Sequence, residues 1–171
     1  GFSRLYPVLR AMEGAGRVRR GYFVAGLGGA QFALAGAVDR LREHRGGAGP
    51  AGVEVLAATD PAQPYGAALP WPEAAAGAAG RPARVAGAYV VIVGGVASLF
   101  VERRGRGLLA LREPDGTWEA GALGALDGLL SSGRLGRISA GRVTPGLERH
   151  LADAGYTPTP KGWTRYSALR G

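Results

Sequence analysis

Residues 16–34 read GRVRRGYFVAGLGGAQFAL and decide the fold of the N-terminal part of the chain. The side chains over 17–24 suit a strand, the glycine-rich stretch 26–29 suits a turn, and 30–34 suits a returning strand. The sequence therefore predicts a two-stranded hairpin here.

A helix is predicted just before this hairpin. Leu5, Val8 and Met12 recur at helical spacing. Ser3 is suited to cap the first turn. A helix followed by a two-stranded wing is the second half of a winged-helix unit. Because the chain opens without the first half, we expect it to be part of a longer protein.

The predicted wing carries a basic cluster made of Arg17, Arg19 and Arg20. Alternation along a strand places Arg17 and Arg19 on one face, where their guanidinium groups can contact successive phosphates. Tyr22 and Phe23 follow directly, and either ring can stack on an unpaired base or pack beneath the wing. We therefore expect nucleic-acid binding through this cluster and Tyr22.

The rest of the chain predicts short strands with few helices. The strands are expected at 53–58, 85–93, 96–102, 108–112, 138–143 and 163–167, and the helices at 37–44, 118–130 and 146–154. This pattern is typical of an α+β fold, namely a small β-barrel or a strongly curved antiparallel sheet with packed helices, preceded by the winged-helix half.

Two domains are expected. Residues 1–45 form the winged-helix remnant with a short helix, and residues 46–171 form the barrel-like C-terminal domain. The glycine-rich segment 45–52 is interpreted as a flexible joint. Residues 59–84 predict a long loop rich in proline and alanine, and we expect its part 73–80 to be a mobile spacer.

The composition limits the chemistry. The 171 residues carry a net charge of +8 with a pI near 10.7, which favours association with nucleic acid. The chain has no cysteine, which excludes disulfides and thiol nucleophiles. Lys161 is the only lysine and lies in no phosphate-binding loop, so we expect no ATP hydrolysis by this chain. His44 and His150 stand in no metal-binding motif, and no metal site is expected.

A second basic cluster, Arg103, Arg104 and Arg106, lies at a predicted hairpin tip. Three guanidinium groups on one turn repel each other and add little to stability, so an anionic partner such as nucleic acid explains them. The alternative is that they keep a strand edge soluble. Both interpretations remain open.

The long loop contains the sequence TDPAQPYG at 59–66. An aspartate before a proline commonly accepts backbone N–H bonds in an Asx turn, and we expect Asp60 to hold the loop in this way. The functional alternative places Asp60 as a catalytic carboxylate at the mouth of a pocket lined by Tyr65 and Trp71.

Five stretches carry a resemblance to a known family. They are YPVLR at 6–10, GRVRRGYF at 16–23, AQFA at 30–33, AATDPAQPYG at 57–66 and ALPWP at 68–72. In them the chain resembles the C-terminal region of the Lhr (large helicase-related) family of bacterial ATP-dependent DNA helicases, which ends in winged-helix units and a β-barrel. The resemblance implies that a superfamily 2 helicase motor, with its ATP and magnesium, lies upstream, and that this chain holds no cofactor.

The resemblance and the charge together predict a noncatalytic DNA-binding and assembly module at the C-terminus of a DNA repair helicase. The expected partners are DNA, the upstream helicase domains of the same protein and further copies of the chain, and no membrane. The expected place is the bacterial cytoplasm, on the nucleoid.

Two other functions remain open. The extension resembles winged-helix DNA glycosylases in architecture, and some members of the helicase family are associated with uracil removal, which needs a base flipped into a pocket. Those glycosylases use a Gln-x-Gln or Gln-x-Asp pair, whereas Gln31 is followed here by Phe32 and Ala33. The other alternative is a barrel that drives self-association.

Overall fold

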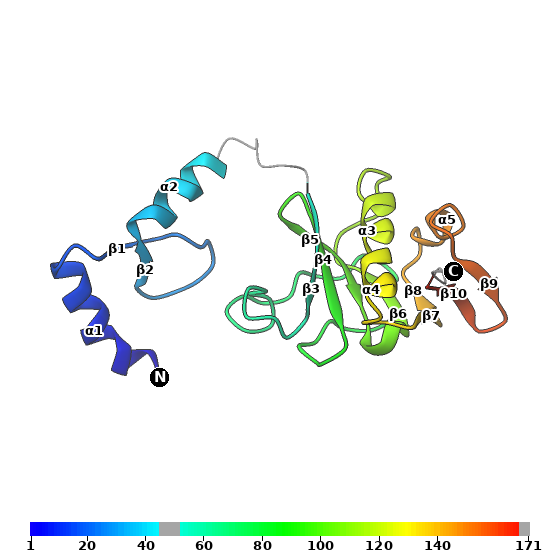
Figure 1. The fold of residues 1–171 in the computed structure, drawn as a ribbon, viewed down its shortest axis with the longest axis horizontal. Coiled ribbons are helices and arrows are strands. Elements are labelled where there is room, and N and C mark those ends of the chain that lie inside the picture. The colour runs from blue at the N-terminus through cyan, green and yellow to red at the C-terminus, as the bar shows by residue number, and fades with distance from the viewer. Residues whose placement is uncertain (45–51, 168–171) are drawn as a thin grey trace. The chain divides into compact units, whose positions relative to one another are not determined.

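The computed structural model describes residues 1–44 and 52–167. The chain forms two compact units, Gly1–Pro50 and Ala51–Gly171, which we call unit 1 and unit 2 (Figure 1). The predicted domain boundary and the segment interpreted as a flexible joint, except Gly52, lie outside the described residues.

Within residues 1–44, unit 1 consists of two helices and a two-stranded hairpin. Its elements are α1 (Phe2–Gly14), β1 (Val18–Gly21), β2 (Gln31–Leu34) and α2 (Ala35–His44). α1 begins one residue before Ser3, with Gly1 at the N-cap position and no capping side chain. The predicted Ser3 cap is therefore wrong, whereas the order of helix, hairpin and helix agrees with the sequence.

The hairpin is shorter than predicted, because beyond Gly21 the backbone N–H groups donate to the side chain of Gln31 and not to the opposite strand. β1 and β2 pair antiparallel over four residue pairs. Beyond Gly21, the N–H groups of Phe23 and Val24 donate to the side-chain oxygen of Gln31, both at 2.8 Å. Residues 22–30 therefore form a loop instead of continuing the two strands.

Within residues 52–167, a five-stranded sheet forms the centre of unit 2. In spatial order its strands are β3 (Val53–Ala57), β4 (Tyr89–Val93), β5 (Val96–Val101), β6 (Gly107–Ala110) and β8 (Arg142–Val143). Neighbours pair antiparallel, except β6 and β8, which are parallel. Gly94 and Gly95 form the tight turn between β4 and β5 with φ values of 57° and 81°, a conformation that favours glycine.

Short helices and a small second sheet complete unit 2. The helices are η1 (Arg103–Gly105), α3 (Glu119–Ala125), α4 (Asp127–Ser131) and α5 (Glu148–Leu151), and the second sheet holds β7 (Arg137–Ala140), β10 (Gly162–Tyr166) and β9 (Thr157–Thr159) in spatial order. The single helix predicted at 118–130 is divided at Leu126. Among the described residues, no helix is both long and apolar enough to cross a membrane.

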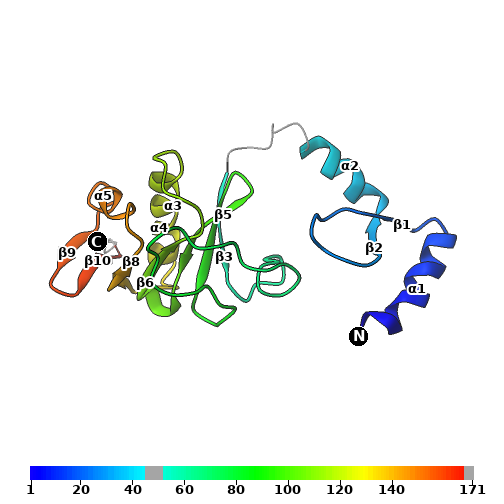
Figure 2. The same ribbon diagram turned by 180° about the vertical axis from the view of Figure 1, so that it is seen from behind.

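Both faces of the five-stranded sheet are covered, which explains why its strands are almost continuously apolar. Val91 and Leu99 pack on the side of α3 and α4. Val90 and Phe100 pack on the opposite side, with side chains of the 59–84 loop. Figures 1 and 2 show the two helices on one face of the sheet and this loop on the other.

The sheet is open, so the predicted barrel is not borne out, although the α+β class is. In the described part of unit 2, β3 and β8 lie at opposite edges of the sheet and no ladder joins them, as a closed barrel would require. The strand predicted at 138–143 is divided at Gly141, because β7 pairs with β10 while β8 pairs with β6. At Gly141 the chain therefore passes from the second sheet to the edge of the five-stranded sheet.

The 59–84 loop is part of the packed structure. Ala75 is buried, and its N–H donates to the carbonyl of Ala110 in β6 at 3.0 Å. The N–H of Ala76 donates to the carboxylate of Glu113 at 2.7 Å. Small alanine side chains let this backbone approach the sheet, so the expectation of a mobile spacer at 73–80 is wrong.

Trp118 is the largest fully buried side chain of the described residues. Its indole N–H donates to the carbonyl of Glu113 at 3.2 Å, and the guanidinium of Arg112 lies 5.1 Å from the ring centroid. The next residue, Glu119, is also buried. Burial opposes ionisation of Glu119, but N–H bonds from Gly116 and the neighbouring backbone prevail and lower its pKa.

Candidate nucleic-acid interface

The three arginines of the wing differ in their contacts within the described residues: Arg20 has side-chain partners, whereas Arg17 and Arg19 have none. Arg17 and Arg19 are exposed, and neither side chain has an ion pair or hydrogen bond within the described residues. The Nε atom of Arg20 lies 3.4 Å from the carboxylate of Glu13, and its Nη1 donates to the hydroxyl of Tyr6 at 3.3 Å. Arg17 and Arg19 are therefore free to meet phosphates, whereas Arg20 also joins the hairpin to α1.

Of the two rings considered for stacking on a base, Tyr22 is the accessible one. Its side chain is 93% exposed. Phe23 is half-buried and folds back over Gly21, where an added Cβ would lie 3.1 Å from the Phe23 ring.

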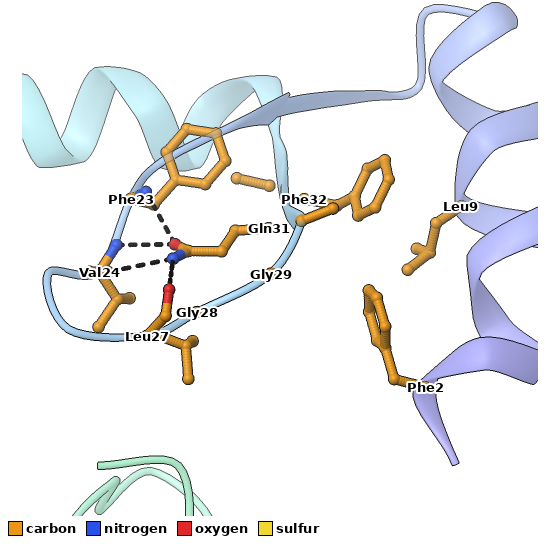
Figure 3. Close-up of a pocket in the computed structure, with 11 residues that line it drawn as sticks. Phe2, Leu9, Phe23, Val24, Leu27, Gly28, Gly29, Gln31 and Phe32 are labelled. Atoms are coloured by element: carbon orange, nitrogen blue, oxygen red, sulfur yellow. Dashed lines mark hydrogen bonds between the residues drawn. The ribbon is translucent and has the colours of Figure 1, made fainter.

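Gln31 fixes the wing loop with both atoms of its amide. It is buried, and its oxygen accepts the N–H groups of Phe23 and Val24. Its nitrogen donates to the carbonyls of Leu27 at 2.7 Å and Val24 at 3.1 Å (Figure 3). The amide has two acceptor and two donor positions, and the loop backbone occupies all four. No local sequence pattern around Gln31 predicted this structural role.

An apolar groove of about 550 Å³ lies between α1 and the wing loop. Phe2 and Leu9 line it from the helix, and Leu27 and Phe32 line it from the hairpin (Figure 3). None of the described residues that line it carries a charge. The groove is therefore suited to apolar packing and not to phosphate binding.

The three arginines of the predicted hairpin tip separate in the structure. Arg104 and Arg106 line a depression of about 650 Å³ together with Arg134 and Arg137. Arg103 lines a neighbouring depression of about 260 Å³, to which Arg106 also contributes. Arg134 and Arg137 were not predicted from the sequence, because tertiary packing, including that of η1 against β7, brings them to Arg104.

The Asx turn predicted at Asp60 is confirmed. The Asp60 carboxylate accepts the N–H of Ala62 at 2.8 Å. Gln63, which the sequence analysis did not single out, is fully buried in the same turn. Its amide nitrogen donates to the carbonyl of Ala58 at 3.0 Å, and its oxygen accepts the N–H of Tyr65.

Arg84 closes the loop from its far end. Its guanidinium donates to the carbonyls of Gln63 at 2.6 Å and of Thr59 and Asp60 at 3.3 Å each. The guanidinium of Arg84 therefore provides hydrogen-bond donors for loop carbonyls that are not paired in a β-ladder. This role of Arg84 was not predicted, since a lone arginine between Ala83 and Val85 gives no sequence signal for contacts with residues 59–63.

Tyr65 and Trp71, the rings proposed to line a pocket, contact each other. Their centroids lie 6.0 Å apart with an interplanar angle of 24°, which is a stacked arrangement. Trp71 also meets Phe100 of β5 edge-on at 5.5 Å. Both rings are half-buried and help the loop to cover the sheet.

A further polar pair lies where α3 faces α5. The Nε2 atom of His150 lies 4.0 Å from the buried carboxylate of Glu119 and has no hydrogen-bond partner among residues 1–44 and 52–167. Among the described residues, no group of three or more His, Asp or Glu side chains is arranged to hold a metal ion.

Comparison with known proteins decides the family. Residues 1–53 match the sequence model of a family described as "Large helicase-related protein, winged-helix domain". Over 95% of its length, the chain is 45% identical to a protein of Mycolicibacterium smegmatis named "Lhr helicase/ probable uracil glycosylase". The chain belongs to the Lhr family.

A second Lhr protein, from Escherichia coli, is named "Lhr helicase/uracil glycosylase" and is 42% identical over 67% of the chain. The chain spans only 12% and 8% of the lengths of these two Lhr proteins. The resemblance seen in the five sequence stretches is thereby confirmed, and so is the winged-helix character of the first residues.

Proposed function

We propose that this chain is a noncatalytic DNA-binding and assembly module at the C-terminal end of an Lhr helicase. The proposal rests on the exposed guanidinium groups of Arg17 and Arg19, which have no partner in the described part of the chain. They lie on a winged-helix hairpin, next to the exposed ring of Tyr22. Such groups hold phosphates and position a protein on DNA without reading its sequence.

The proposal includes the surroundings of the module. The helicase motor, with its ATP and magnesium, belongs to another part of the protein, and this chain needs no cofactor. The net charge of +8 supports a place on the bacterial nucleoid. Association of several copies would multiply the phosphate contacts of one assembly.

The wing is tested by changing Arg17, Arg19 and Arg20 together to alanine. We expect weaker binding to duplex DNA and a slope of log K against log salt that is smaller in magnitude by about 2 to 3, because each lost phosphate contact removes about 0.9. Fluorescence anisotropy at a series of salt concentrations measures both quantities.

The matched control changes Arg40, Arg149 and Lys161 to alanine, which removes the same charge from exposed positions outside the wing. If the wing variant and this control weaken binding equally, net charge and not the wing explains the affinity. An unchanged slope in the wing variant would exclude the wing as the contact.

The second candidate function is removal of uracil from DNA, which the names of both relatives favour. The only catalytic candidate from the sequence is Asp60. We propose that Asp60 has a structural role, because its carboxylate already accepts the N–H of Ala62 in a turn.

Asp60→Ala is expected to lower the free energy of unfolding by about 1 kcal/mol, since one turn hydrogen bond is lost. Asp60→Asn retains an oxygen acceptor, and we expect it to change stability less and to leave any uracil release from single-stranded DNA intact. Urea unfolding and a uracil-release assay measure the two effects. Release by the wild type that disappears in a folded Asp60→Asn variant would make Asp60 catalytic and favour the second candidate.

A further inference from the structure

We infer that the depression lined by Arg104, Arg106, Arg134 and Arg137 binds consecutive phosphates of single-stranded DNA, with one base stacked on Tyr166. This inference goes beyond the proposed role of the wing. All of its residues belong to unit 2, and it does not depend on DNA binding by unit 1.

Strand pairing places three of the lining side chains on one face. Arg137 and Ser139 are two residues apart in β7, so they project to the same side of the sheet. Tyr166 of β10 pairs directly with Arg137, which brings their Cβ atoms to about 5 Å from each other. Ile138, which lies between Arg137 and Ser139 in β7, is fully buried on the opposite face. A guanidinium, a hydroxyl and an aromatic ring therefore line one surface.

Close packing brings the other side of the depression to this surface. A Cβ added at Gly105 of η1 would lie 2.9 Å from the Cα of Ile138, so only glycine lets η1 approach β7 this closely. The preceding residue, Arg104, has a φ of 62°, in the left-handed region that non-glycine residues rarely adopt. The N–H of Gly141 donates to the carbonyl of Arg106 at 3.0 Å and holds the backbone of Arg106 in place.

The four guanidinium groups are unpaired within the part of the chain that the structure describes. None of them has an ion pair or a side-chain hydrogen bond within the described residues, and no acidic side chain lines the depression. Two acidic side chains of unit 2 are engaged elsewhere: Glu102 pairs with Arg142, and Asp127 pairs with Arg165. Four positive charges in one depression repel each other, and adjacent phosphates would relieve that repulsion.

The shape and the ring favour a single strand over a duplex. A depression of about 650 Å³ has room for a nucleotide, whereas the phosphates of a duplex lie on a convex surface. The side chain of Tyr166 is 66% exposed. Only an unpaired base offers a free face for stacking on such a ring.

The experiment measures the affinity of the full chain for a short fluorescent oligothymidylate. We expect Arg134→Gln with Arg137→Gln to weaken binding about tenfold or more, because charge-assisted hydrogen bonds to phosphate are lost. The control pair Arg149→Gln with Lys161→Gln removes the same charge outside the depression and should weaken binding less than about twofold. All four positions are exposed, and equal urea midpoints check that each variant is folded.

The ring is tested separately on two probes. Tyr166→Ala is expected to weaken binding of oligothymidylate about fivefold or more, because base–aromatic stacking is lost, and to leave binding of an abasic oligomer unchanged. Tyr166→Phe should bind both probes as the wild type does.

If the Arg134→Gln, Arg137→Gln variant and the control variant lost equal affinity for oligothymidylate, the phosphate site would be overturned. An equal loss on the corresponding duplex would overturn the assignment to single strands. The wing variant, which changes Arg17, Arg19 and Arg20, tests unit 1 only. Its effect on duplex binding therefore does not alter the interpretation of the variants in the depression of unit 2.

Discussion

Trp118→Ala is expected to lower the free energy of unfolding of unit 2 by about 3–5 kcal/mol, the cost of removing a large aromatic side chain from a core. Trp118 is 1% exposed and lies in the core between the sheet and α3. Its loss leaves a cavity and leaves the Glu113 carbonyl without its donor. Urea unfolding followed by far-ultraviolet circular dichroism measures the change.

Tyr166→Ala is the matched control for this substitution, because it also truncates an aromatic side chain but at a position that is 66% exposed. We expect it to change stability by less than about 1 kcal/mol. If Trp118→Ala cost no more than the control, the packing of Trp118 between the sheet and α3 would not be a major source of stability.

Gln31→Leu is expected to open the wing loop by removing its four hydrogen bonds to backbone groups. At about 0.5–1 kcal/mol for each of the four net hydrogen bonds, the loss amounts to about 2–4 kcal/mol of local stability. The amide hydrogens of Phe23 and Val24 should then exchange with solvent about thirtyfold faster or more, which hydrogen exchange followed by NMR measures.

Gln31→Glu separates the two halves of this clamp. A carboxylate accepts the N–H groups of Phe23 and Val24 but cannot donate to the carbonyls of Val24 and Leu27. We expect intermediate exchange rates in this variant. Unchanged exchange in Gln31→Leu would mean that the loop keeps its shape without the amide.

Local sequence signals predicted one hairpin and one turn of unit 2 correctly. The apolar runs separated by Gly94 and Gly95 indicated the β4–β5 hairpin, and Asp60 before Pro61 indicated an Asx turn. In each case the partners lie within a few residues, so spacing alone carries the information.

Three errors in unit 2 arose where a distant partner decides the structure. The composition of residues 73–80 suggested a mobile segment, but the N–H of Ala75 donates to the carbonyl of Ala110 in β6. The barrel failed because β7 pairs with β10, a choice that depends on residues near the end of the chain. The arginine depression was only half predicted, since Arg134 and Arg137 reach Arg104 through tertiary packing.

Arg84 joins the two ends of the 59–84 loop by hydrogen bonds and not by a covalent bond. A disulfide between the two ends of the 59–84 loop would restrict the chain before folding as well as after it. The contact between Arg84 and the carbonyl of Asp60 joins residues 24 positions apart but exists only in the folded state. Closing a segment of that length costs about 3 kcal/mol of chain entropy. In this cysteine-free protein, that entropy is lost during folding, and the packing of the loop on the sheet must compensate for it.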